Sequence, residues 1–135
     1  MPAKRRSLLD SFAMLAFLSR ESGFEKVRSL LREAQRSKEP LLMNEINLGE
    51  VYYMTAKDRS FEQAEDFLRR LETLPIQAVA NSFAAVLEAA KLKARFPISY
   101  ADAFAVATAI RMNAAVVTGD PEFRQVEHLV TIDWL

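Results

Sequence analysis

A nearly uncharged helix followed by a short strand constrains the fold of this chain more than any other stretch. Pro97 closes the segment before it, Ser99 is a good N-cap, and residues 100 to about 112 are strong helix formers with almost no charge. The run 115–118 is rich in β-branched residues and is closed by Gly119-Asp120-Pro121. We therefore predict a buried helix and then a strand that ends in a turn.

The same unit carries two acids. Asp102 lies in the first turn of the predicted helix, and Asp120 lies just past the end of the predicted strand. In an open parallel sheet, ligands bind beyond the carboxyl ends of the strands. Both carboxylates are therefore expected at one edge of a sheet.

The remaining chain alternates short apolar runs with helical segments. This pattern predicts an α/β fold: a single domain over residues 1–135, with a three-layer α/β/α architecture and a mostly parallel central sheet of four to five strands. Strands are expected at 7–9, 40–43, 76–79, 115–118 and 129–132, and helices at 11–20, 24–36, 44–53, 60–71, 82–95 and 100–112.

Composition narrows the function only slightly. The 135 residues include no cysteine, so nothing points to an oxidising compartment, and no apolar stretch is long enough to cross a bilayer; a cytoplasmic location is expected. Lysine plus arginine and aspartate plus glutamate both total 18, so the chain lacks an overall basic signature for nucleic acid. If four acids gather in one pocket, the remaining surface carries a surplus of four positive charges.

Four acids are expected in one crevice. Asp10 follows the first strand, Glu50 lies within two turns of the end of the second, and Asp102 and Asp120 come from the unit described above. At about 5 Å and an effective dielectric of about 20, each like-charge pair costs roughly 3 kcal/mol. Such a group requires protons or a cation.

Divalent metal chemistry follows from this expectation. An all-oxygen ligand set suits Mg²⁺ or Mn²⁺, which often share their shell with substrate phosphate, so a phosphodiester is the natural substrate. One or two such ions would activate a water and neutralise the charge on the leaving oxygen. A covalent route has no candidate nucleophile, because cysteine is absent and the single histidine, His128, lies in a predicted polar loop.

Each of these residues also has a structural interpretation. An aspartate after a strand is commonly a helix cap or turn former, an acid beside Ser99 could complete a capping pair, and Glu50 could be a surface residue or the partner of a lysine. Three polar residues are candidates for the second shell, where they would orient the acids or a bound water: Ser11, Asn47 and Thr118. Asn44 and Asn47 could equally be helix caps.

Two other groups of residues favour a structural role. The basic tip Lys4-Arg5-Arg6 is expected at the opposite edge of the sheet, as a solvated tip. The phenylalanines are expected in the core and in interfaces rather than in a base-stacking platform: Phe12, Phe17, Phe61 and Phe67.

Four segments around the acids carry a family resemblance. Leu8-Leu9-Asp10-Ser11, the run 47–53 (NLGEVYY), Ser99-Tyr100-Ala101-Asp102-Ala103 and the run 118–123 (TGDPEF) resemble, in order and spacing, the signature segments of PIN-domain ribonucleases, and most closely VapC toxins of bacterial toxin-antitoxin pairs. The resemblance spans nearly the whole chain.

The resemblance, and not the periodicity, implies Mg²⁺- or Mn²⁺-dependent cleavage of single-stranded RNA at a metal cluster of Asp10, Glu50, Asp102 and Asp120. It also implies a homodimer and a small antitoxin partner, for which the apolar helical faces at 12–24 and 61–71 are the expected docking surface. The alternative is a catalytically silent PIN-like module that binds metal or a partner. A phosphoacceptor or phosphatase domain is disfavoured, because Phe12 stands two residues after Asp10, where such a domain has an aspartate.

Overall fold

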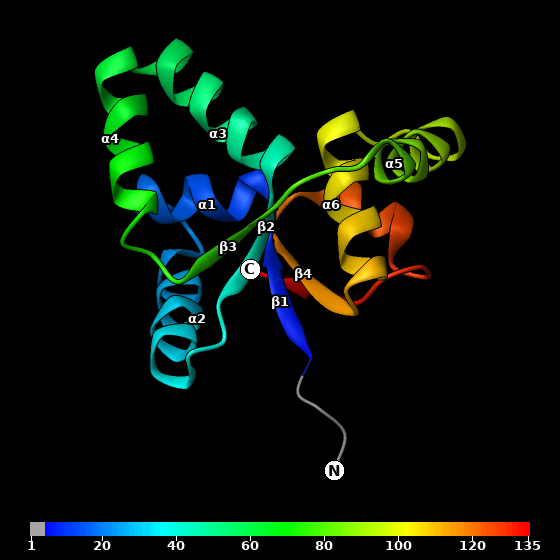
Figure 1. The fold of residues 1–135 in the computed structure, drawn as a ribbon, viewed down its shortest axis with the longest axis horizontal. Coiled ribbons are helices and arrows are strands. Elements are labelled where there is room, and N and C mark those ends of the chain that lie inside the picture. The colour runs from blue at the N-terminus through cyan, green and yellow to red at the C-terminus, as the bar shows by residue number, and fades with distance from the viewer. Residues whose placement is uncertain (1–4) are drawn as a thin grey trace.

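A five-stranded parallel sheet forms the centre of the molecule (Figure 1). The computed structural model describes residues 5–135, so Lys4 of the predicted basic tip lies outside the described residues. The strands run in the order β3-β2-β1-β4-β5, and all four neighbouring pairs are parallel. Their bounds are β1 Arg6–Leu9, β2 Leu41–Asn44, β3 Ile76–Val79, β4 Ala114–Thr118 and β5 Ile132–Trp134.

The helices begin where the sequence places caps. The hydroxyl oxygens of Ser60, Ser82 and Ser99 accept hydrogen bonds from backbone N–H groups three residues ahead, which satisfies donors that a helix start leaves unpaired. The described segments are α1 Ser11–Leu18, α2 Phe24–Ser37, α3 Glu45–Asp58, α4 Phe61–Leu71, α5 Phe83–Arg95, α6 Tyr100–Arg111 and a 3₁₀ helix, η1, at Pro121–Val126.

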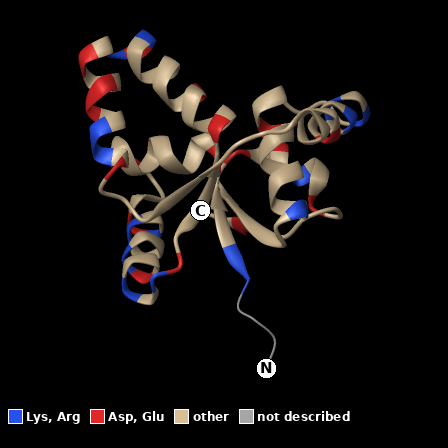
Figure 2. Ribbon diagram, in the orientation of Figure 1, with Lys and Arg blue, Asp and Glu red and all other residues tan. Residues whose placement is uncertain are grey.

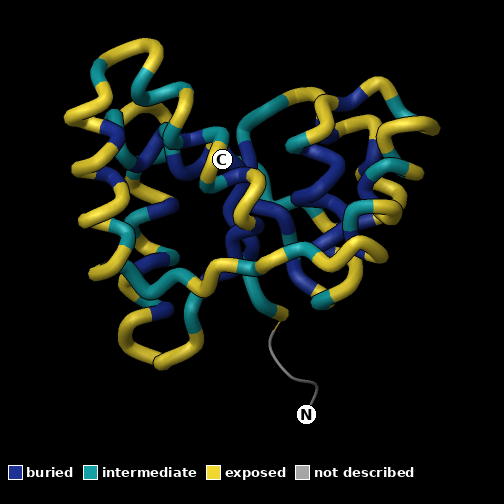
Figure 3. The backbone as a smooth tube through the Cα atoms, turned by 45° about the horizontal axis from the view of Figure 1, so that its top comes forward, coloured by how far each residue is buried: buried dark blue, intermediate teal, exposed yellow. Residues whose placement is uncertain are grey.

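Alternating residues of the strands pack into two hydrophobic cores, one on each face of the sheet. Leu8 and Val116 point into the core that α5, α6 and η1 cover, whereas Leu9 and Val117 point into the core beneath α1 to α4. Figure 1 shows the two helical groups on opposite sides of the sheet, and Figure 3 shows the buried positions concentrated between them. The predicted three-layer α/β/α architecture is therefore confirmed, with five parallel strands.

Three details differ from the expectations. The last strand is Ile132–Trp134 rather than 129–132, because Val130 packs into the core as part of a loop and Leu129 is exposed. Residues 121–126 form a 3₁₀ helix where a loop was expected. Arg6 is not a solvated tip: it begins β1, and its guanidinium donates to Pro40 O at 3.0 Å and to Gln77 Oε1 at 2.9 Å.

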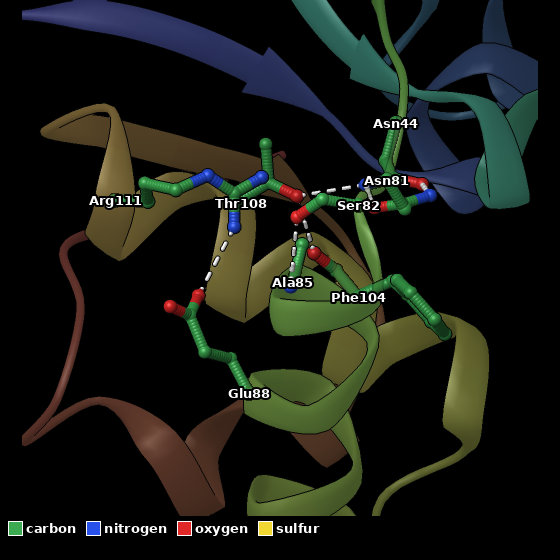
Figure 4. A network of polar contacts seen from close by, with 8 residues as sticks. All are labelled: Asn44, Asn81, Ser82, Ala85, Glu88, Phe104, Thr108 and Arg111. Carbon is green, nitrogen blue, oxygen red and sulfur yellow. Dashed lines mark hydrogen bonds and ion pairs between the residues drawn. The ribbon is translucent and has the colours of Figure 1, made fainter.

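A polar network ties the end of β2 to the loop after β3 and to α6 (Figure 4). Asn44 caps α3 through its Oδ1, which accepts from Ile46 N at 2.8 Å. The Asn44 amide N–H₂ donates to Asn81 Oδ1 at 2.7 Å and to the Thr108 hydroxyl at 2.8 Å, and Asn81 returns a hydrogen bond at 3.0 Å. The network fixes the start of α3 against the loop after β3 and against α6.

Candidate metal centre

The centre lies at the carboxyl ends of the two middle strands. Leu9 pairs with Val117 in the β1–β4 ladder, so the residues that follow the two strands leave the sheet side by side. Asp10 follows β1, and Asp120 lies two residues past the end of β4. The third acid, Asp102, is carried to the same edge by the first turn of α6.

Asp10 is held in a single orientation. Its side chain is 1 % exposed and caps α1, with Oδ1 accepting from Ala13 N at 2.8 Å. The Thr118 hydroxyl donates to Asp10 Oδ2 at 2.5 Å and accepts from Asp120 N at 3.0 Å. Thr118 therefore links the turn after β4 to the carboxylate after β1, as predicted for a residue that orients the acids.

Three carboxylates converge closely enough to share one ion. Asp102, Asp120 and Glu122 each offer one oxygen, and these oxygens all lie within 4.8 Å of one another. Asp120 caps η1 by accepting from Glu122 N at 2.9 Å, which folds the exposed Glu122 back toward the site. Sequence reasoning missed Glu122. The available signal was Pro121 at the first position of a helical turn, which places an acid in that turn beside Asp120.

The buried acids retain protons to unusually high pH. Burial raises the pKa of Asp10 to about 7, and the charges of Asp120 and Glu50 add to this effect, although hydrogen bonds from Thr118 and Ala13 oppose it. Burial also raises the pKa of Asp102 to about 8, together with a hydrogen bond to Glu122 and the charges of Asp120 and Asp10. Desolvation and mutual repulsion thus disfavour the ionised cluster.

Glu50 lies at the margin of this cluster. It is half-buried on α3 and close enough to Asp10 for its charge to raise that pKa, but its oxygens are outside the three that lie within 4.8 Å. The structure therefore brings Asp102, Asp120 and Glu122 within 4.8 Å of one another, whereas Asp10 and Glu50 lie outside this group. Asp10 is still close enough for its charge to raise the pKa of Asp102, and Asp120 and Glu50 act on Asp10 in the same way.

Asn47 and Ser11 bind one another rather than the carboxylates. The Ser11 hydroxyl donates to Asn47 O at 3.3 Å, and Asn47 Nδ2 donates to Ser11 Oγ at 3.3 Å and to Ala101 O at 3.2 Å. Asn47 is fully buried, and its Oδ1 finds no partner among residues 5–135. The pair joins the first turns of α1, α3 and α6. Asn44 is a helix cap, whereas Asn47 is not.

In the part of the chain that the structure describes, no lysine or arginine forms an ion pair with the acids of the site. Within residues 5–135, none of the ion pairs formed by the protein includes Asp10, Glu50, Asp102 or Asp120. Acidic and basic residues are by contrast interspersed along α2 and α4 (Figure 2). The site has the composition of a hard-cation site, with carboxylate oxygens and no sulfur or imidazole donor, and this set fits Mg²⁺ or Mn²⁺.

The remaining candidates have structural roles or lie at the surface. The His128 ring packs edge-on against Phe96, with ring centroids 5.6 Å apart. Of the four phenylalanines expected in the core and in interfaces, Phe17 and Phe67 are buried in the core, whereas Phe12 and Phe61 are 42 % and 71 % exposed. No helix in the described part of the chain is long and apolar enough to span a membrane.

A parallel α/β domain with acids gathered at the carboxyl edge of its sheet defines the class of this protein. The PIN domain family model matches residues 7–129, and the chain belongs to this family. A comparison with curated protein sequences found no match.

Solved structures share the fold at low sequence identity. The chain is similar to VapBC2 from Rickettsia felis bound to a promoter DNA fragment, with a TM-score of 0.73, 17 % identity, and coverage of 96 % of this chain and 98 % of that one. The match to DNA-bound VapBC from Salmonella typhimurium has a TM-score of 0.72 and 14 % identity, and it covers 97 % of this chain and 98 % of that one. The match to VapBC-1 from nontypeable Haemophilus influenzae has a TM-score of 0.62 and 18 % identity, and it covers 96 % of each chain.

Proposed function

We propose that this chain is a divalent-metal-dependent endoribonuclease that hydrolyses phosphodiester bonds of single-stranded RNA as the toxin of a VapC-type toxin-antitoxin pair. The main observation in support is a cluster of acids at the carboxyl edge of the sheet of a PIN domain. Among residues 5–135, these acids have no basic partner. Structural acids on a surface are ordinarily solvated or paired, and buried ones rarely lack a partner.

The role of each acid follows from its position in the site. Asp102, Asp120 and Glu122 would hold Mg²⁺ or Mn²⁺, with Asp10 and Glu50 completing the acidic set beside them. A bound ion supplies Lewis-acid stabilisation of the phosphate and activation of a water. Because Asp10 and Asp102 hold protons near neutral pH in the metal-free protein, ion binding displaces those protons.

The second-shell residues keep these carboxylates in place. Thr118 donates to Asp10, which leaves lone pairs on both Asp10 oxygens directed away from the protein's own donors. Asn47 and Ser11 hold the first turns of α1 and α6 against α3, and so they set the spacing of Asp10, Glu50 and Asp102.

A groove among the N-terminal helices fits the predicted antitoxin partner. A cavity of about 770 Å³ lies between α1, α3 and α4, in the region where a docking surface was expected. Its floor is apolar and its rim charged, which suits an amphipathic segment. The residues that define its floor and rim include Leu15, Leu18, Met54 and Phe67, and Arg20, Arg59 and Asp66. The similar structures include VapBC2 from Rickettsia felis and a toxin-antitoxin complex from Klebsiella pneumoniae, and this likeness supports the partner class.

A homodimer and a cytoplasmic location complete the proposal. Phe83 and Leu87 are 74 % and 44 % exposed one turn apart on α5, and an apolar pair of this kind suits contact with a second copy. An RNA substrate places the activity in the cytoplasm. The single catalytic domain is taken to span residues 1–135.

The decisive experiment is cleavage of labelled single-stranded RNA by purified protein with Mn²⁺, with Mg²⁺ and with chelator. We expect cleavage that requires metal and is lost in Asp10→Asn, because the substitution removes one ligand charge next to Asp102 and Asp120. Equal activity of Asp10→Asn would indicate a contaminant or another site. Metal binding by the wild-type protein without hydrolysis of any RNA would favour a silent binding module.

A further inference from the structure

An exposed aromatic ring stands at the edge of the acidic site. Phe12 occupies the first turn of α1, two residues after Asp10, and is 42 % exposed. The neighbouring residues of the same helix are buried, including Ala13 and Met14. A large apolar side chain in this position is not explained by packing into either core.

The ring is held by the turn that carries Asp120. A Cβ placed on Gly119 would lie 2.4 Å from Phe12 Cε1 and 2.9 Å from Cζ, so the ring rests directly on the glycine backbone. Gly119 is followed by Asp120, and Phe12 is preceded by Ser11 and Asp10. One edge of the ring is therefore fixed between two acid-bearing segments, while the rest of the ring is open to solvent.

We propose that Phe12 is a stacking platform for a base of the RNA, next to the phosphodiester held at the acidic cluster. This inference rests on the proposed function and adds a contact that the acids cannot make, because carboxylates and a cation contact only the phosphate. Stacking on an aromatic face requires no particular base, since each base has a π-face. A ring already fixed on Gly119 loses little side-chain entropy when it binds.

The place of Phe12 separates it from the other phenylalanines. Phe17 and Phe67 are buried in the core beneath α1 to α4, and Phe61, although 71 % exposed, begins α4, which contributes no acid to the site. Phe12 alone among these four combines exposure with contact to a segment that bears a site acid. This position favours the substrate as the occupant over a second copy of the chain.

The test uses single-stranded RNA with 2-aminopurine placed in turn on each side of the cleaved bond. Binding is followed by fluorescence in Ca²⁺, which takes oxygen ligands, and cleavage is followed in Mn²⁺. We expect the wild-type protein and Phe12→Tyr to quench 2-aminopurine at a position beside the cleaved bond. In Phe12→Leu the quenching is lost and KM rises about tenfold, with kcat within about threefold of wild type.

Phe61→Leu is the matched control, because it removes an even more exposed ring from a helix without a site acid, and its quenching and KM should equal those of the wild type. Phe12→Met provides a second non-aromatic variant should Phe12→Leu fail to fold. Unchanged quenching and KM in the non-aromatic variants would overturn the stacking role while metal-dependent cleavage stood. A loss of dimer in light scattering, with KM unchanged, would assign the ring to an interface and also overturn it. Absence of RNA cleavage by the wild type would instead overturn the proposed function.

Discussion

Charged residues are arranged in opposite ways in the acidic site and in the groove between α1, α3 and α4. In the groove, acids and arginines alternate and find partners: Arg69 pairs with Asp66, the Arg70 guanidinium lies 4.9 Å from the centre of the Phe17 ring, and Arg59 donates to Ser19. In the acidic site, carboxylates face one another and are partly protonated. The charged groups of the groove find partners within the protein and leave the groove open to an amphipathic chain. The acidic cluster, by contrast, is stable only with protons or a cation.

The difference teaches that burial, rather than the number of acids, defines a candidate metal centre. Exposed surface pairs contribute little free energy and exchange partners readily. Asp102 is 6 % exposed and lies among buried alanines of α6, so water screens its charge poorly. Asp66 on α4 is exposed and pairs with Arg69.

The largest expected effect comes from a substitution in the acidic site. Asp102→Asn removes a carboxylate from the group of oxygens within 4.8 Å, and we expect Mn²⁺ affinity and RNA cleavage each to fall at least about a hundredfold. Calorimetric titration with Mn²⁺ measures the first and a single-turnover assay the second. The control is Glu62→Gln, an exposed acid in the first turn of α4, which should leave both unchanged. Full Mn²⁺ affinity in Asp102→Asn would place the ion elsewhere.

A smaller effect tests the groove side. Leu18→Glu introduces an unpaired charge on the groove floor, and we expect the affinity for the proposed antitoxin partner to fall about tenfold or more. Surface plasmon resonance with that purified protein gives the value. Leu68→Glu, the same change at a 40 % exposed position of α4 outside the groove, is the matched control. Equal losses in the two variants would mean that the partner does not use the groove.

The smallest effect concerns stability and pH. Because the folded protein holds protons on Asp10 and Asp102 more tightly than the unfolded chain does, their contribution is fully present below about pH 4 and is lost as pH rises through 7 to 8. In chelator, Asp102→Asn should therefore melt roughly 3–5 °C above the wild type at pH 8, with the difference shrinking toward pH 5. Differential scanning calorimetry at four pH values measures this. A difference independent of pH would contradict the burial of an ionisable Asp102.

Much of the fold follows from local signals in the sequence. The helix starts near Ser60, Ser82 and Ser99 and the β-branched run before Gly119 are short-range features, and all four lie within one residue of the predicted positions. The last strand was misplaced because Val130 is apolar and β-branched, yet tertiary packing places it in a loop that covers the core.

The candidate site was only partly accessible from sequence. Strand-end position correctly brings Asp10 and Asp120 together, because it depends only on the parallel sheet. The closeness of Glu122 depends on the hydrogen bond that closes η1, and the exposure of Phe12 depends on the path of the chain at Gly119. Neither property has a periodic signature, so only three-dimensional packing reveals them.

The strand order has a consequence for when the acidic site can assemble during synthesis. β1 is the first strand made but lies in the middle of the sheet, and its neighbour on one side, β4, is among the last. The hydrogen bond from Thr118 to Asp10 spans 108 residues of chain. A nascent polypeptide still emerging from the ribosome, or a fragment cut before β4, therefore has Asp10, Glu50 and Asp102 but neither Asp120 nor Glu122. The site can form only when nearly all of the polypeptide has been translated, so incomplete products cannot carry out the chemistry proposed for it.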